Sequence, residues 1–238
     1  MRPEPDPHYR HRFPAELIAH AVWLYRTFPL SVRDVERLLA ERGVKVSYET
    51  FRRWCRNFAQ TFANRLRRRR PRPGDRWHLD EVFIKINGVQ HYLWGVQHYL
   101  WRAVDQEGVV LDILVQCRRN TKAAKRIFKK LPKGLRYVPR EVVTDKLKSY
   151  AAAKAKIIPG VEHRQSRYLN NLLNNRADNS HQPTRQRERR MKRFTSPRQA
   201  QQVLAAHGPI YQHSHPRRHR MSAAEYRTYR ADAFAVWQ

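Results

Sequence analysis

The sequence predicts an α/β protein in which a small group of N-terminal helices precedes a mixed β-sheet and further helices. Two observations carry this prediction. The first sixty residues place apolar side chains at helical spacing, whereas residues 77–86 and 109–115 are rich in β-branched and apolar residues bounded by turn signals. A length of 238 residues is enough to bury a core in one main domain and a smaller one.

The chain is strongly basic. Lys and Arg total 49 against 20 Asp and Glu, which gives a formal charge of +29 and a pI near 11.1. This charge favours nucleic acid as the partner, with an anionic membrane as the weaker alternative. No apolar run approaches the roughly 20 residues that span a bilayer, and no signal peptide is visible, so we expect a cytoplasmic protein with no membrane partner. Two cysteines are too few for a disulfide framework or a four-cysteine zinc site.

Three helices are predicted before residue 64. The first begins at Pro14 and is closed by Pro29. Ser31 and Asp34 form a capping-box pattern at the start of the second helix, and Ser47 can cap the third.

The third predicted helix has an apolar face and a basic face. Its apolar residues are Phe51, Trp54, Cys55 and Phe58, and its polar residues are Arg52, Arg53, Arg56 and Asn57. Two helices joined by a tight turn, the second of them basic, are typical of a helix-turn-helix whose last helix enters the major groove. The alternative is a small packing domain with solvated arginines. We predict a helix-turn-helix over residues 1–64 in which these four polar residues bind DNA.

An arginine-rich segment with two prolines follows at residues 65–76. It contains Arg67, Arg68, Arg69 and Arg70. Proline and glycine break helices, and arginines bind phosphates without reading bases. The segment therefore predicts a domain boundary and a basic linker that follows the DNA backbone.

Two predicted strands carry or precede an aspartate. Asp80 lies within residues 77–86, and Asp145 directly follows the short buried strand at 141–144. The order is a hairpin, a third strand, a basic helix over 121–130 and a returning strand, which is compatible with a mixed sheet whose carboxylates converge. A third acid, Asp178, lies in a basic, Asn-rich segment. Three such carboxylates can hold two Mg²⁺ ions against a phosphodiester.

The C-terminal third is basic and helical. Ser196 can cap a helix over residues 197–206, and aromatic residues recur at helical spacing in 223–237. We expect both helices to pack on the sheet-containing domain.

Four short segments together form a recognisable pattern: Trp77-His-Leu-Asp-Glu81, Val143-Thr-Asp-Lys146 with Tyr150, His163-Arg-Gln165, and Asn174-Asn-Arg-Ala-Asp-Asn-Ser-His181. They resemble the bacterial insertion-sequence transposases of family six. The resemblance implies a DDE transposase with an N-terminal helix-turn-helix. It also implies an RNase H-like, integrase-like catalytic domain, with a mixed sheet and basic C-terminal helices, over residues 77–238.

The resemblance also implies roles for single residues. Asp80 and Asp145 become the first two catalytic, metal-binding carboxylates, and Asp178 takes the third position, which is a glutamate in the family. Lys146 and Arg185 become DNA contacts. The implied cofactors are two Mg²⁺ (or Mn²⁺) ions. The implied reaction cleaves the terminal inverted repeats of an insertion sequence and joins the 3′-hydroxyls to target DNA, with at least a homodimer on DNA in the bacterial nucleoid.

Three departures from the family pattern predict reduced activity. Asp178 is one methylene shorter than glutamate, which withdraws its oxygens by roughly 1.5 Å where Mg²⁺ tolerates a few tenths. Glu188 is the weaker candidate for the third ligand. Residues 88–94 recur unchanged as 95–101, and an odd insertion in a strand must be looped out, bulged or added to the hairpin. Residues 172–175 resemble a four-residue insertion after 168–171.

Two other functions stay open at this stage. One is a sequence-specific DNA-binding protein without catalysis, either a binder of element ends or a repressor. The other is an RNase H-like nuclease without strand transfer. A transposase shows metal-dependent cleavage, which a protein that only binds DNA lacks. A transposase also joins a 3′-hydroxyl to target DNA, which a nuclease does not.

Overall fold

The computed structural model describes residues 11–70, 72–86, 98–145, 147–165, 182–191, 194–216 and 221–235. Within these ranges no helix is both long and apolar enough to cross a membrane. The chain divides into two compact units, one of residues 1–70 with 206–238 and the other of residues 71–205. Helix α7 (Pro197–Ser214) crosses the second division, so its first residues belong to one unit and its last residues to the other.

Three helices open the first unit: α1 (Ala15–Thr27), α2 (Val32–Ala40) and α3 (Tyr48–Arg69). The predicted capping box is confirmed. Ser31 Oγ accepts the Asp34 N–H at 3.1 Å, and the Asp34 carboxylate accepts the Ser31 N–H at 2.8 Å. Gly43 takes the left-handed conformation (φ +76°) in the turn before α3, and the predicted apolar face of α3 is buried.

Helix α3 is longer than the sequence patterns indicate. Phe62, Ala63 and Leu66 continue its buried stripe at helical spacing. Arginine has good helix propensity, so nothing interrupts the helix before Pro71. Residues 65–69, which we expected to be linker, are therefore the last turns of α3.

The second half of α7 and helix α8 (Ala223–Ala235) pack on the N-terminal helices rather than on the sheet. Ile210 is fully buried in the core of the first unit. The Thr27 hydroxyl donates to Ser214 Oγ at 3.1 Å, and the Phe234 ring lies 5.4 Å from that of Trp23. The expected packing on the sheet domain holds only for the first turns of α7, because the apolar stripe of this helix continues past residue 206.

The second unit contains a five-stranded mixed sheet of order β3-β2-β1-β4-β5. Strands β1 (Arg76–Ile84), β2 (His98–Asp105) and β3 (Val110–Gln116) are antiparallel neighbours. Strand β4 (Glu141–Thr144) runs parallel to β1, and β5 (Glu162–Gln165) runs parallel to β4. This arrangement confirms the predicted mixed sheet with a strand that returns beside the first.

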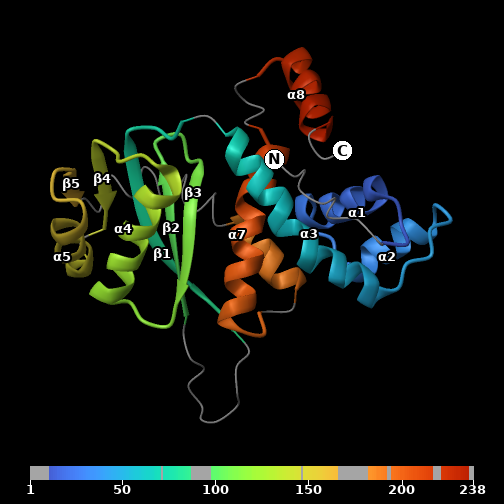
Figure 1. Ribbon diagram of the computed structural model, residues 1–238, viewed down its shortest axis with the longest axis horizontal. Helices are drawn as coiled ribbons and strands as arrows, with labels where there is room; N and C mark the ends of the chain where they lie inside the picture. The colour runs from blue at the N-terminus through green and yellow to red at the C-terminus, as the bar shows by residue number, and fades with distance from the viewer. Residues whose placement is uncertain are drawn as a thin grey trace, which may run out of the picture. The chain divides into compact units, whose positions relative to one another are not determined.

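Helices cover both faces of this sheet (Figure 1). Trp77 and Leu79 of β1 face helices α4 (Thr121–Leu135) and α5 (Lys148–Ile157), in one core cluster. Val82 and Ile84 point to the opposite face of the sheet, where they pack with Phe194 and the first turns of α7 in a second core cluster. The sequence patterns do not predict α5 or β5, but the resulting α/β, RNase H-like architecture is the one expected.

The second copy of the repeat supplies part of β2. His98, Tyr99, Leu100 and Trp101 pair with Ile84, Phe83, Val82 and Glu81 in an unbroken antiparallel register. The insertion is therefore not absorbed as a bulge in these pairs. The first copy, residues 88–94, lies outside the described residues, so the thirteen residues 85–97 that connect β1 to β2 take up the additional length.

We expect deletion of residues 88–94 to stabilise the sheet unit. The deletion shortens the β1–β2 connection from thirteen residues to six and leaves every pair of the two strands intact. Loop-closure entropy then predicts a gain of about 0.7 kcal/mol in unfolding free energy, measurable by urea denaturation. Replacing the same seven residues with a Gly/Ser segment of equal length is the control and should change little. Lower stability after the deletion would show that the first copy makes stabilising contacts.

Candidate active site on the parallel strand pair

The pairing of β1 with β4 sets the two predicted aspartates on neighbouring strand ends. Arg76 pairs with Glu141, Trp77 with Val142 and His78 with Val143, and each pair is 65 residues apart. Asp80 and Asp145 are also separated by 65 residues. Continuing this register by two residues places them at the same level of neighbouring parallel strands, which lie about 4.8 Å apart.

Asp80 lies on the sheet face opposite to α4 and α5, and it is half-buried. Its Oδ1 accepts the N–H of Glu81 at 2.9 Å. Its cross-strand partner on β2 is Arg102, which is buried. Burial lowers the pKa of Arg102 to about 10, and the negative charge of Asp80 opposes this shift.

Arg102 also connects the sheet to the helix over residues 182–190. Its Nη2 donates to the Thr184 hydroxyl at 2.5 Å, and both side chains are buried. This contact places the start of that helix beside the strand position opposite Asp80. The helix begins at residue 182, one residue before Pro183, and proline is well tolerated in a first turn.

Asp145 follows the last residue of β4, and its side chain is 31% exposed. Its Oδ1 accepts the N–H of Leu147 at 3.0 Å, and its Oδ2 accepts a hydrogen bond from Arg119 Nη2 at 2.9 Å. The preceding residue is also fixed: the Thr144 hydroxyl donates to the Asp145 carbonyl at 2.8 Å and lies 2.9 Å from His163 Nε2 of β5. The histidine in the quoted His-Arg-Gln segment therefore supports the backbone of the second carboxylate.

Glu81 is a third carboxylate of the site that sequence reasoning did not single out. It alternates with Asp80 on β1, so it faces the α4 and α5 side, where its side chain is 2% exposed. It accepts hydrogen bonds from the Tyr150 hydroxyl and from Arg119 Nε. Two features of the sequence could have indicated its role: its position next to Asp80 and the presence of Tyr150 in the quoted motif.

Burial controls the electrostatics of this group. Burial raises the pKa of Glu81 to about 7, and Asp145 adds to the rise, while the hydrogen bond from Tyr150 and the charge of Arg119 oppose it. Burial and the nearby carboxylates raise the pKa of Tyr150 well above its usual value, so it stays a hydrogen-bond donor. Burial tends to lower the pKa of Arg119, but Glu81 and Asp145 outweigh it and the pKa is raised.

The described site contains two of the three predicted metal ligands. Asp178 and Lys146 lie outside the described residues, and within the described ranges no three His, Cys, Asp or Glu side chains gather into a possible metal site. The donors present still fit a divalent ion, because carboxylate oxygens are the ligands that Mg²⁺ prefers. Asp145 already accepts a cation, the guanidinium of Arg119.

Glu188, the weaker candidate for the third ligand, is used elsewhere. Its Oε1 accepts the backbone N–H of Lys85 at 3.0 Å. Lys85 lies five residues beyond Asp80, which corresponds to about 17 Å along a strand. This geometry argues against Glu188 as the third ligand.

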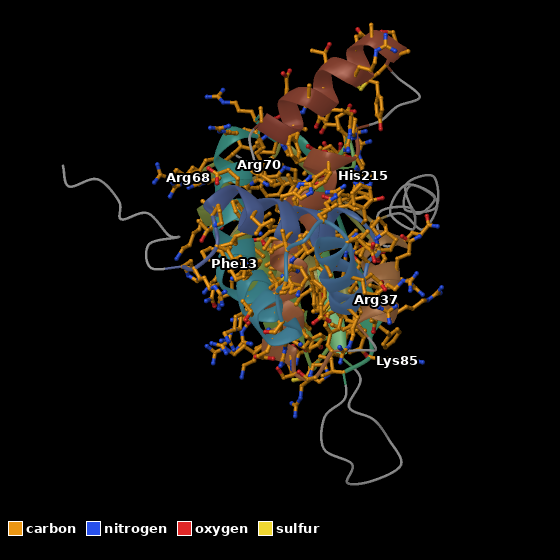
Figure 2. The ribbon with its side chains drawn as sticks, turned by 90° about the vertical axis from the view of Figure 1, so that its right-hand side faces the viewer. Phe13, Arg37, Arg68, Arg70, Lys85 and His215 are labelled. Carbon is orange, nitrogen blue, oxygen red and sulfur yellow. The ribbon has the colours of Figure 1, made fainter. Side chains whose placement is uncertain are left out.

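The predicted DNA-binding residues of α3 are exposed. Arg52, Arg53, Arg56 and Asn57 lie opposite the buried stripe of this helix, and Arg52 forms a surface ion pair with Glu49 at 3.3 Å. Arg68 and Arg69 are exposed in the last turn of α3, with Arg67 and Arg70 partly buried, and the labelled Arg68 and Arg70 lie at this end of the helix in Figure 2. Arg185 is exposed on the helix over residues 182–190.

Comparison with known proteins defines the class. Residues 74–216 match a family model described as a DDE domain, and the chain belongs to the DDE transposase family. Among individual relatives, it is 34% identical over 167 residues to the transposase for insertion sequence-like element IS431mec of Staphylococcus aureus. It has the same identity over the same length to the transposase for insertion sequence element IS257 in transposon Tn4003, also of Staphylococcus aureus. In both cases the match covers 68% of this chain and 71% of the relative.

Solved structures give weaker similarities. The catalytic core domain of BIV integrase matches with 14% identity and a TM-score of 0.42, over 69% of this chain and 99% of that domain. A chain of the simian T-cell lymphotropic virus intasome matches with 13% identity and a TM-score of 0.43, over 62% of this chain and 51% of that one. The assignment of the fold rests on the strand order and on the family, not on these two matches.

We expect Tyr150→Phe to destabilise the sheet unit. The change removes the hydroxyl that donates to the buried Glu81 carboxylate and keeps the ring between Trp101 and Phe128. A hydrogen bond to a charged group contributes roughly 1.5–3 kcal/mol. Urea denaturation at pH 8, above the pKa of about 7 of Glu81, should therefore show a loss of this size. Tyr99→Phe is the control, because the Tyr99 hydroxyl makes no hydrogen bond with a described residue. Equal small losses in both variants would mean that the Tyr150 hydroxyl is not needed to hold Glu81.

Proposed function

We propose that the protein cleaves the ends of an insertion sequence and joins the freed 3′-hydroxyls to target DNA. The observation that carries the proposal is the register of β1 and β4, which sets Asp80 and Asp145 at one level of adjacent parallel strands. Membership of the DDE transposase family supplies the reaction class. Carboxylates held on neighbouring elements of a rigid sheet are what a metal-dependent phosphoryl transfer on DNA requires of a protein.

In this proposal Asp80, Asp145 and Asp178 hold two Mg²⁺ or Mn²⁺ ions. When bound, such ions polarise the phosphodiester and neutralise the negative charge that develops on its oxygens. Asp178 precedes the helix over residues 182–190 by four residues. The contact between Arg102 and Thr184 keeps the start of that helix on the Asp80 face, and this supports Asp178 as the third ligand.

The protein's own side chains orient the carboxylates. Arg102 faces Asp80 across the strand pair, and Arg119 with the Leu147 N–H engages both oxygens of Asp145. Lys146 and Arg185 contribute positive charge for the DNA backbone. These roles need no covalent protein–DNA intermediate.

The first unit would bind the element ends. The exposed face of α3 presents Arg52, Arg53, Arg56 and Asn57, and Arg67–Arg70 at its end would add phosphate contacts. A net charge of +29 supports strong, salt-dependent attraction to any DNA and therefore an association with the nucleoid. Joining requires two ends at once, so we infer a homodimer or a larger assembly on DNA.

A second candidate is a protein that binds element ends but no longer cleaves them. The substitution of aspartate for glutamate at position 178 and the two small repeats favour it. A related nuclease would hydrolyse DNA and leave the 3′-hydroxyl free, whereas a transposase would join it to target DNA.

We expect Asp178→Glu to raise activity at least about tenfold over the unmodified chain. A glutamate restores the missing methylene, and a misplaced ligand or catalytic group costs one to two powers of ten. The measurement is Mg²⁺- or Mn²⁺-dependent cleavage and joining of labelled element ends, with binding followed separately by gel shift.

Three variants control this experiment. Asp80→Asn and Asp145→Asn should abolish cleavage and joining while DNA binding stays nearly intact. Glu188→Gln should cleave like the unmodified chain, because the Glu188 carboxylate accepts the backbone N–H of Lys85 and is not assigned to the metal site. No cleavage by either the unmodified chain or Asp178→Glu, with intact binding, would support the binding-only alternative. Activity in Asp80→Asn would contradict the assigned site.

We expect Arg53→Gln combined with Arg56→Gln to weaken binding to element ends by about thirtyfold to ten-thousandfold, since each of the two lost base contacts costs roughly 1–3 kcal/mol. Both side chains are exposed, so the unfolding free energy should be unchanged. The measurement is the ratio of affinities for end DNA and for unrelated DNA at fixed salt. Lys129→Gln combined with Lys133→Gln, which removes two exposed positive charges from the other unit, is the control for net charge. An unchanged affinity ratio would contradict the assignment of α3 as the recognition helix.

A further inference from the structure

Arg119 bridges two carboxylates that come from different strands. Its Nε donates to Glu81 of β1, and its Nη2 donates to Asp145, after β4, at 2.9 Å. The planar guanidinium suits this geometry, because it presents several donors in a fixed fork. Arg119 itself lies between β3 and α4, next to Asn120, whose side chain caps α4 by accepting the Ala123 N–H at 3.0 Å. The cap fixes the backbone beside the arginine.

The two ends of this bridge differ in burial. The Glu81 side chain is 2% exposed, whereas that of Asp145 is 31% exposed and that of Arg119 is 39% exposed. The Glu81 contact is therefore sheltered from water and the Asp145 contact is not. Exposed ion pairs contribute about 0–1 kcal/mol and exchange readily, while breaking a buried pair is costly.

Glu81 cannot follow Asp145 if that residue moves. The Tyr150 hydroxyl holds its carboxylate, and the Tyr150 ring is fully buried between Trp101 at 5.3 Å and Phe128 at 6.2 Å. The anchor of Arg119 is thus part of the core that α4 and α5 form on the sheet. Asp145 is the partner that is free to exchange the arginine for another cation.

We propose that Arg119 is a positioning residue that occupies the second metal-binding carboxylate in the metal-free protein and releases it to a divalent ion, while staying anchored on Glu81. This inference rests on the proposed function in taking Asp145 as a metal ligand. Asp145 Oδ2 accepts the arginine where a metal would need an oxygen. The guanidinium keeps Glu81 and Asp145, two like charges, together until the ion arrives. The general reaction of DDE enzymes does not require such a residue. The proposed role of Arg119 follows from its two contacts with Glu81 and Asp145.

The test measures Mn²⁺ binding to the full-length protein without DNA, by the electron paramagnetic resonance signal of free Mn²⁺. We expect Arg119→Gln to bind Mn²⁺ about tenfold more tightly, because the ion no longer competes with a cation at Asp145. Without metal, the variant should unfold at a lower temperature than the unmodified chain. Saturating Mn²⁺ should narrow this gap without closing it, because the tighter ion binding adds stability while the buried contact of Arg119 with Glu81 is lost in both states. Both readouts are independent of cleavage.

Two matched variants separate the contact from general charge. Arg119→Lys keeps the charge and should bind Mn²⁺ within about twofold of the unmodified chain. Arg118→Gln removes one charge at the neighbouring, exposed position and should also stay within about twofold. Equal or weaker Mn²⁺ binding in Arg119→Gln, or equal tightening in Arg118→Gln, would overturn the inference. If Arg119→Gln does not fold, Glu81→Gln compared with Glu81→Gln/Arg119→Gln gives the same comparison without an unpaired buried carboxylate.

Asp145→Asn separates failure of this inference from failure of the proposed function. Loss of Mn²⁺ binding in Asp145→Asn confirms the ligand, and the Arg119 comparison then decides the inference alone. Unchanged Mn²⁺ binding in Asp145→Asn would overturn both, because Asp145 would not be a metal ligand.

Discussion

The parallel pairing of β1 with β4 is the constraint on which the candidate site depends. Asp80 and Asp145 are 65 residues apart in sequence, and only the register of these two strands brings them to one level. The register is held by burial: Trp77 and Val142, which pair across the strands, are fully buried beneath α4 and α5. A slip of one residue would turn these side chains out of the core, so the packing that stabilises the sheet also fixes the carboxylates.

A second constraint is local charge. The chain carries a large positive charge, yet exposed charges more than about 8–10 Å away are screened and cannot neutralise buried acids. Each carboxylate of the site therefore has a cation beside it. Arg102 lies across from Asp80, and Arg119 lies between Glu81 and Asp145. The basic surface is proposed to attract DNA, whereas these two arginines lie beside single carboxylates of the sheet unit.

The sequence was most informative where one local pattern decides the structure. The capping residues Ser31 and Ser47 begin helices as predicted, and the run at 141–144 is a buried strand. It was least informative where distant packing decides. Helix α5 has weak amphipathic character, β5 is mostly exposed, and α3 continues through its arginines because Leu66 still finds a core. Similarly, the sequence gives no sign that Glu81 is buried. Its side chain is covered only because α5 places Tyr150 against it.

The internal repeat leaves the described site intact for a physical reason. The second copy is continuous with Arg102, so using it for β2 keeps Arg102 opposite Asp80, whereas using the first copy would interrupt the strand between Trp94 and Arg102. The additional residues fall in the connection between β1 and β2, whose length they roughly double. Doubling the length of a flexible loop costs only about 0.6 kcal/mol. The other departures, at residues 172–175 and 178, come just before the helix that Thr184 ties to Arg102. That helix is held at its start by Thr184, so in the proposed site a change in length or side chain between β5 and Thr184 bears on the third carboxylate more directly than the longer repeat does.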